Sequence, residues 1–472
     1  MLFSSPVFIY VFLPIVLLCY YTVLRNKRNL QNVFLFLSSL FFYAWGEPKF
    51  VLVMILSIVV NWSLGLLVNN YKQKRILFSK FLIALTVFSN LLILFIFKYL
   101  NFTVNNINGF FGTSINIKSI ALPIGVSFFT FQAMSYVIDV YRGKGNVQKN
   151  IINVGLYISF FPQLIAGPIV RYETVADQIK NRKETTEDFF NGFTRFVFGF
   201  SKKVLLANSF AIIADRSFDG LAEGMNLSVL GAWLGAICYT LQIYYDFSGY
   251  SDMAIGLGKM FGFHFLENFN YPYISTSITE FWRRWHISLG SWFRDYVYFP
   301  MGGSRVKKRR LVFNLFIVWM LTGVWHGANW TFVLWGFMYF FLLVTEKLTG
   351  FYKTEKKILK PLLWIYTFIF VVFGWVLFRS NSISDAIHYF SVMFGKGTLL
   401  IDDIFMRDLN QIIIYIVIGV LFSFPVTGFF KKKFKQGIVK DIVFVIIVIG
   451  LFILSVASVV SSSYNPFIYF NF

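Results

Sequence analysis

The sequence predicts an all-α, polytopic membrane protein with about 10–12 transmembrane helices and a few re-entrant or interfacial helices. Hydrophobic residues make up 57% of the 472 residues and charged residues only 14%, which excludes a soluble globular domain. Apolar runs recur along the whole sequence, and most approach the roughly 20 residues that a helix needs to cross a bilayer. The main runs are Pro6 to Leu24, Phe50 to Leu67, Phe78 to Phe97, Leu227 to Tyr244, Leu362 to Phe378, Ile412 to Phe424 and Ile442 to Val460.

The apolar runs follow one another without a soluble linker, a low-complexity tract or a repeat. The first run, Pro6 to Leu24, has no basic stretch before it and no small-residue cleavage site after it, so we expect a retained helix and not a removed signal peptide. The expected organisation is a single membrane domain over residues 1–472. Cys19 and Cys238 lie far apart in apolar segments, so neither a disulfide nor a thiolate metal site is predicted.

The positive charges predict the orientation in the membrane. The 43 Lys and Arg against 22 Asp and Glu give a formal charge of +21, which in a soluble protein would suggest nucleic acid. Here they fall in short loops, as expected on the cytosolic side of the cytoplasmic membrane, next to anionic headgroups. These loops contain Arg25, Lys27 and Arg28; Lys72, Lys74 and Arg75; Arg142, Lys144 and Lys149; Arg305 and Lys307 to Arg310; and Lys431 to Lys433. The N-terminus, the turn at 46–48 and residues 101–116 are then expected outside.

Two segments depart from a simple alternation of helices and loops. Residues 153–170 are apolar with basic residues on both flanks, and residues 189–214 carry Lys202 and Lys203 in mid-run. Both predict re-entrant or interfacial helices whose lysines reach the headgroups. Irregular backbone at membrane depth is tolerated only where protein or a water-filled cavity surrounds it, so these segments suggest an internal site.

Polar and aromatic residues concentrate in a central block, residues 239–335, which we expect to carry the catalytic site. It contains the candidate site residues Asp246 and Tyr250 and both histidine motifs, those of His286 and His326. Ionisable side chains at membrane depth are costly to bury, so both histidines are candidates for a functional site.

The first histidine lies in a tract rich in arginine and tryptophan. If residues 278–299 form one helix, Arg283 and Arg294 are 11 residues apart and nearly in line, with His286 one turn from Arg283. Guanidinium groups make bidentate hydrogen bonds to phosphate, which makes the pair a candidate contact for a phosphate-bearing ligand. The alternative, favoured for Arg284, is an anchor at the cytosolic headgroups. The tryptophans that would frame this tract are Trp282, Trp285 and Trp292.

The second histidine, His326, lies between Gly323 and Gly327, where the missing side chains allow backbone or substrate to approach closely. A neutral imidazole in such a place can take a proton from a hydroxyl that attacks an acyl carbon. A structural histidine with satisfied hydrogen bonds is the alternative. The residues that would separate the ring from lipid are Trp325, Asn329 and Trp330, of which Asn329 would also fix the tautomer.

Other chemistries fit the sequence poorly. It has no Gly-x-Ser-x-Gly elbow, no His-x-x-x-His spacing for zinc, no P-loop and no dinucleotide fingerprint. We therefore expect no metal and no resident cofactor. His264 and His388 stand alone and are expected to be structural or exposed.

At these residues the chain resembles the membrane-bound O-acyltransferase superfamily, and within it the branch that includes alginate O-acetyltransferase and proteins that O-acetylate exopolysaccharides or peptidoglycan. The resemblance runs through nearly the whole length, and its combination of motifs is highly specific. The motifs are Phe42–Trp45, Pro123–Phe129, Ala166–Ile169, Tyr245–Tyr250, Glu267–Pro300, Gly302–Gly303, Trp325–Gly327 and Phe378–Arg379. The resemblance implies a helical membrane enzyme in which the histidine matching His326 is essential and the position matching His286 lines the same tunnel.

The resemblance further implies an acyl group taken from a cytosolic thioester, for which we expect acetyl-CoA. His326 would then be the general base toward a polysaccharide hydroxyl presented from outside, and Arg283 and Arg294 would contact the donor phosphates. The other residues expected along the tunnel are Trp282, Trp285, Trp325, Asn329, Asp246 and Tyr250. Because the chain has almost no extracytoplasmic domain to hold a polysaccharide, we also expect a partner protein on the outer face.

Two other functions stay open. D-Alanyl transfer to teichoic acid from a carrier protein belongs to a related branch that shares the two histidines; the glycine pair after Phe299–Pro300 and the chain length favour O-acetylation instead. A transporter or flippase would also line its path with buried His and Arg. The sequence has no inverted repeat that we detect, and Trp325–Gly327 favours chemistry over transport.

Overall fold

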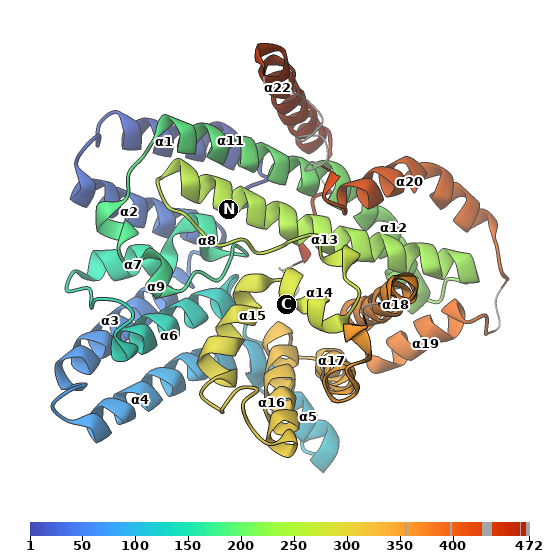
Figure 1. Ribbon diagram of the computed structural model, residues 1–472, viewed down its shortest axis with the longest axis horizontal. Coiled ribbons are helices and arrows are strands. Elements are labelled where there is room, and N and C mark those ends of the chain that lie inside the picture. Colours follow the sequence, from blue (N-terminus) through green and yellow to red (C-terminus); the bar gives the residue numbers. More distant parts are fainter. Residues whose placement is uncertain (355, 397–398, 427–436, 463, 469–472) are drawn as a thin grey trace. The chain divides into compact units, whose positions relative to one another are not determined.

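Every secondary-structure element of the computed structural model is a helix within the residues that it describes, namely 1–354, 356–396, 399–426, 437–462 and 464–468 (Figure 1). The expected all-α class is therefore confirmed for these residues. The basic run at 431–433 that was assigned to the cytosolic side lies outside the described residues.

The chain divides into two compact units. The first consists of Met1–Val197 with Tyr250–Leu266, and the second of Phe198–Gly249 with Glu267–Phe472. The expected central block, residues 239–335, belongs to the second unit except for Tyr250–Leu266. The organisation as one domain stays a prediction.

The first unit contains short and long helices in close succession. They are η1 (Phe8–Phe12), α1 (Leu13–Tyr21), α2 (Arg28–Gly46), α3 (Val51–Tyr71), α4 (Ile76–Leu94), η2 (Phe95–Tyr99), α5 (Leu100–Phe111), α6 (Val126–Arg142), α7 (Ile151–Ser159), α8 (Phe161–Leu164), α9 (Tyr172–Val175), α10 (Gln178–Asn181) and most of α11 (Thr186–Ser201).

The second unit contains the remaining helices, with α13 shared between the two units. They are η3 (Lys202–Ala207), α12 (Asn208–Ala222), α13 (Val229–Met260), η4 (Pro272–Ile274), α14 (Ile278–Arg284), α15 (Ile287–Phe293), η5 (Arg294–Tyr298), α16 (Lys308–His326), α17 (Trp330–Thr349), η6 (Phe351–Lys353), η7 (Lys357–Leu359), α18 (Lys360–Arg379), α19 (Ile383–Met393), α20 (Asp403–Phe422) and α22 (Ile438–Ser461).

Seven helical segments of the described chain are long and apolar enough to cross a membrane, so the protein is multi-pass. They are Val51–Tyr71, Ile76–Phe111, Thr186–Ala222, Trp330–Thr349, Lys357–Arg379, Asp403–Phe422 and Ile438–Ser461. The number is lower than the expected 10–12, and the first apolar run forms a shorter helical segment, Phe8–Tyr21.

The two segments expected to be irregular differ in outcome. Residues 189–214 lie within one continuous helical segment, Thr186–Ala222, that is long enough to span a membrane. Lys203 does not reach a headgroup but is buried in an ion pair with Asp246, so the interfacial expectation is wrong there. Residues 153–170 are interrupted after Ser159 and are buried throughout, in agreement with irregular backbone surrounded by protein. Whether this second segment is re-entrant stays a prediction.

Apolar helices of the first unit are held together by buried amide groups. Helices α3, α4 and α6 lie side by side (Figure 1). Asn61 of α3 and Asn90 of α4 are both buried and exchange hydrogen bonds of 2.9 and 3.2 Å. Such polar contacts between helices add specificity where apolar faces alone would slide past one another. Gly65 of α3 provides room for the ring of Tyr136 on α6, which a Cβ would meet at 2.5 Å.

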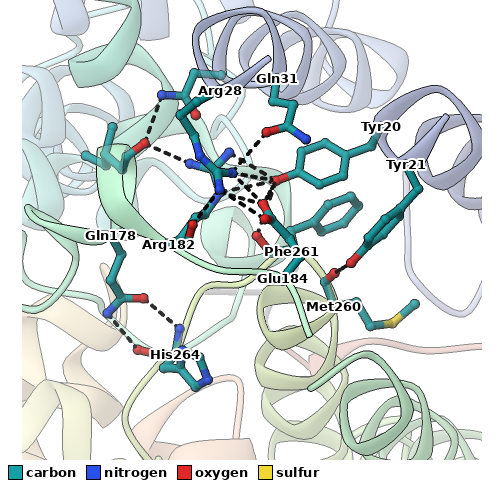
Figure 2. Close-up of polar contacts among 12 residues, drawn as sticks. Tyr20, Tyr21, Arg28, Gln31, Gln178, Arg182, Glu184, Met260, Phe261 and His264 are labelled. Carbon is teal, nitrogen blue, oxygen red and sulfur yellow. Dashed lines mark hydrogen bonds and ion pairs between the residues drawn. The ribbon is translucent and has the colours of Figure 1, made fainter. Parts of the chain in front are cut away.

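A partly buried ionic cluster ties α1 and the start of α2 to the segment that precedes α11 (Figure 2). Glu184 accepts hydrogen bonds from Arg28 and from the hydroxyl of Tyr20. The side chain of Arg182 is fully buried, donates to Tyr20 at 3.2 Å and to the carbonyl of Ile179 at 2.8 Å, and lies 3.6 Å from Glu184. One carboxylate therefore balances two guanidinium groups in the interior of the unit.

We expect Glu184→Gln to destabilise the first unit, because it leaves the buried Arg182 without its carboxylate. The expected cost is about 2 kcal/mol, measured as a lower midpoint of thermal unfolding in detergent. Glu187→Gln is the matched control because Glu187 is exposed on the next helix; equal midpoints for the two variants would contradict the role of the cluster.

The difference in stability between wild type and Glu184→Gln should depend on pH. Burial alone would raise the pKa of Glu184, but hydrogen bonds from Arg28 and Tyr20 outweigh burial and hold the pKa below its ordinary value of 4.5. A carboxyl whose pKa is lower in the folded state stabilises the fold above the unfolded pKa, and this stabilisation is lost as the pH falls through the folded pKa. The stability difference between wild type and Glu184→Gln should thus be complete at neutral pH and shrink below pH 4.5.

Candidate functional site

His326 is the last residue of α16 and is enclosed by aromatic rings from three helices of the second unit. Its residue exposure is 4%. The imidazole lies 5.0 Å from the ring of Trp325 and 5.1 Å from those of Trp335 on α17 and Phe378 on α18, all nearly edge to face. An imidazole in this surrounding is shielded from water, which strengthens any hydrogen bond or proton transfer that it makes.

The glycines near His326 are explained by helix packing. Helix α16 is in close contact with α17, and a Cβ on Gly323 would lie only 2.5 Å from the carbonyl oxygen of Phe332 and 3.3 Å from Gly336. A Cβ on Gly327 would lie 2.1 Å from the ring of Phe332. The space beside both glycines is therefore filled by α17, and the expectation that it admits a substrate is wrong on that side.

His286 stands at a break between two helices. Helix α14 ends at Arg284 and α15 begins at Ile287, while His286 has φ of 44° and ψ of 53°. A side chain other than glycine is uncommon in this left-handed region, and such residues cluster at functional sites. The expected single helix over residues 278–299 is therefore wrong, and the argument that placed Arg283, His286 and Arg294 on one side of it fails.

Hydrogen bonds fix the orientation of the His286 ring. Its Nδ1 lies 3.1 Å from Oδ1 of Asn268, and this same oxygen accepts hydrogen bonds from the backbone N–H and the hydroxyl of Ser288 at 3.2 and 2.8 Å. Because the Ser288 N–H can only donate, it identifies the Asn268 atom as the carbonyl oxygen, and Nδ1 then carries the proton. Nε2 is left as the basic nitrogen of the ring.

The environment of His286 favours the neutral imidazole. The residue is 2% exposed, and the ring of Phe247 meets it edge to face at 4.6 Å. Burial lowers the pKa of His286 from 6.5 to about 3. The ring therefore stays uncharged across the physiological range of pH and can accept a proton or a hydrogen bond.

Trp325 joins the two histidines into one site. Its ring lies 6.1 Å from that of His286 and 5.0 Å from that of His326. Both imidazoles thus contact the same indole, although 40 residues separate them in the sequence. The structure brings together the two residues that the sequence singled out as candidates.

Two other predicted tryptophans pack among the rings around this site. Trp282 packs against Trp319, Trp335 and Tyr339, and Trp335 in turn contacts His326. Trp285 is buried and packs against Trp375 at 4.7 Å. Both residues support the rings around the histidines, so their placement near the site agrees with the sequence.

The remaining candidates lie elsewhere or have other partners. Arg283 and Arg294 are exposed, and Arg294 forms an ion pair with its neighbour Asp295. Asn329 caps α17 through the N–H of Thr331 and donates to the carbonyl of Asn381 at 2.7 Å. These contacts stabilise a turn. That Asn329 fixes the tautomer of His326 stays a prediction. Tyr250 belongs to the first unit and stacks on Phe3.

Asp246 belongs to the second unit and forms an ion pair with a lysine. Its Oδ1 lies 2.8 Å from Nζ of Lys203, and both side chains are 2% exposed. Among the described residues, no group of three or more His, Cys, Asp or Glu side chains could hold a metal ion. His264 and His388 are exposed, which is one of the two outcomes expected for them from the sequence.

Glu346 is a supporting residue that the sequence analysis missed. Its carboxylate is fully buried and accepts hydrogen bonds from the backbone N–H groups of Ile278 and Thr279 at 2.6 and 2.8 Å and from the Thr279 hydroxyl at 2.6 Å. A carboxylate at the first turn of α14 satisfies unpaired N–H groups and interacts favourably with the helix dipole. A lone acidic residue within an apolar helix was the available signal.

Replacing Glu346 should disturb the site through α14. Glu346→Gln has nearly the same size but loses the charge and points an amide group at donors, which we expect to cost about 2 kcal/mol. A lower midpoint of thermal unfolding in detergent, together with reduced activity, would bear this out. Glu223→Gln, at an exposed position, provides the control, and an unchanged midpoint for Glu346→Gln would refute the capping role.

Comparisons with known proteins agree on one family. A family model described as membrane-bound O-acyltransferase matches residues 144–384, which include both histidines. The chain is 40% identical to the probable alginate O-acetylase AlgI of Azotobacter vinelandii, with 100% of each chain covered. It is 34% identical to the peptidoglycan O-acetyltransferase of Helicobacter pylori over 84% of this chain and 80% of that protein. It is 30% identical to the teichoic acid D-alanyltransferase of Bacillus subtilis over 55% of this chain and 69% of that protein.

Proposed function

Because the chain belongs to the membrane-bound O-acyltransferase family, we propose that this O-acyltransferase moves an acetyl group from acetyl-CoA to hydroxyls of a cell-envelope polysaccharide outside the cytoplasmic membrane. The relatives that match 100% and 84% of this chain are named for O-acetylation of alginate and of peptidoglycan. The observation that carries the proposal is the pair of buried imidazoles, His286 and His326, against one indole.

In the proposed reaction, His326 acts as general base. It takes the proton from an acceptor hydroxyl as that oxygen attacks the thioester carbon; the new C–O ester bond forms, the C–S bond breaks, and the departing thiolate recovers a proton from the imidazolium. General base catalysis of this kind contributes typically about 10² to 10⁴ in rate. The neutral His286 ring lies 6.1 Å from that of Trp325 and would accept a hydrogen bond without adding charge.

The donor and the acceptor are proposed to reach the site from opposite sides of the membrane. Arg283 and Arg294 are exposed, so their guanidinium groups are available for the phosphates of CoA even though they do not share a helix face. His326 is only 4% exposed, so the tunnel to it is part of the proposal. A partner protein that takes the acetyl group on the outer face completes the scheme.

The alternatives have less support. D-Alanyl transfer is the activity named for relatives that match only about half of this chain. A transporter would not need two buried imidazoles against one indole in a water-poor surrounding. Transfer of an acetyl group is therefore the function that the site supports best.

His326→Ala should abolish acetyl transfer, because loss of the imidazole removes the base, while leaving membrane insertion intact. The measurement is polysaccharide-bound acetate in cells that carry the variant. His388→Ala is the matched control, since that histidine is exposed. Acetylation retained by His326→Ala at normal protein levels would refute the catalytic role.

The donor can be identified with isolated membranes. Labelled acetyl-CoA should pass its label to the polysaccharide fraction, whereas a D-alanyl-loaded carrier protein should not, because the O-acetylase relatives cover the whole chain. Transfer of D-alanine in place of acetate would reassign the protein to the other branch.

A further inference from the structure

A short stretch near the C-terminus, Tyr464–Ile468, contacts helices of the second unit, and its last two residues are buried; we call it the tail segment. Phe467 and Ile468 are only 4% and 7% exposed. Tyr464 donates its hydroxyl proton to Asp215 of α12. Asn465 accepts a hydrogen bond from Asn208, also on α12, at 3.3 Å. A short stretch without helical structure is thus bound side by side with α12 through successive residues.

The inner end of the tail segment completes the buried ion pair of Lys203 and Asp246. Lys203 donates to the backbone carbonyl of Pro466 and lies 6.0 Å from the ring of Phe467. The N–H of Ile468 donates to Oδ2 of Asp246 at 2.9 Å. A buried ion pair offsets the cost of removing its charges from water only when further hydrogen bonds satisfy both partners. The tail segment supplies one such bond to each.

This ion pair adjoins the wall of the candidate site. Asp246 precedes Phe247 on α13, and the Phe247 ring packs edge to face on His286 at 4.6 Å and on Phe269 at 4.9 Å. Any displacement of α13 at Asp246 therefore moves a ring that touches His286. Misplacement of a reacting group by about 1 Å can lower a rate by roughly 10²-fold.

We propose that the tail segment, together with Lys203 and Asp246, is a positioning element that holds α13 and thereby the Phe247 ring against His286. The proposal rests on the proposed acyl-transfer function for its kinetic consequence. Asp246 is then a positioning residue and not a catalytic one. Its carboxylate contacts Lys203 and Ile468 and acts on His286 through Phe247.

Removal of one backbone N–H group, that of Ile468, tests the proposal. Ile468→Pro removes the N–H that donates to Asp246, since proline has no backbone N–H, whereas Ile468→Ala keeps the N–H and shortens the side chain. We expect kcat of purified full-length Ile468→Pro to fall about tenfold or more, with the KM for acetyl-CoA within about twofold of wild type. Ile468→Ala should retain most of its kcat. Equal losses in the two variants, or a change confined to KM, would overturn the proposal.

A second pair of variants separates positioning from mere stability. Lys203→Met leaves Asp246 without its cation, and Lys203→Arg restores it; the arginine variant should recover kcat relative to methionine. Recovery of the unfolding midpoint without recovery of kcat would overturn the proposal. It would mean that the pair serves only folding.

A readout that needs no activity separates this proposal from the proposed function. Diethyl pyrocarbonate modifies neutral imidazoles, and mass spectrometry can follow each of the four histidines. His286 should be protected in wild type and modified at least about fivefold faster in Ile468→Pro, with the exposed His264 and His388 unchanged. Unchanged protection of His286 would overturn the positioning role, whereas inactive wild-type enzyme with deprotection in the variant would count only against the acyl-transfer function.

Discussion

Two imidazole rings must be buried and correctly oriented among side chains that are mainly aromatic. This constraint explains most of what surrounds them. An imidazolium would be costly in such a low-dielectric surrounding, and burial indeed lowers the pKa of His286 to about 3. The aromatic rings around His326 come from α16, α17 and α18, so its environment exists only when these helices are packed.

The supporting contacts meet this constraint one by one. The left-handed backbone at His286 turns the chain between α14 and α15, and the Asn268 oxygen holds the ring through Nδ1. The Glu346 carboxylate fixes the start of α14 from α17. Close packing at Gly323 sets the distance between α16 and α17. A strained residue, a polar anchor and a buried carboxylate would each be unfavourable alone, and they persist because the packed helices determine their positions.

The sequence predicted the fold class and the two histidines because hydropathy and rare buried charge are local signals. It failed where structure depends on distant partners. Periodicity could not reveal the break at His286, because a left-handed residue other than glycine leaves no pattern. The sequence predicted that Lys203 reaches a headgroup. Its ion-pair partner Asp246 is 43 residues away in the sequence, so no local pattern indicates the pair. The role of Glu346 was missed for the same reason: its partners belong to α14.

In the proposed reaction, a thioester and a hydroxyl meet at His326 inside the second unit. The most direct test is an experimental structure of the purified protein with a non-hydrolysable thioether analogue of acetyl-CoA. We expect density for the acyl end of the analogue within hydrogen-bonding reach of the His326 ring, with its phosphates toward the side that carries Arg283. An analogue bound elsewhere, with the His326 ring still sealed among Trp325, Trp335 and Phe378, would contradict it.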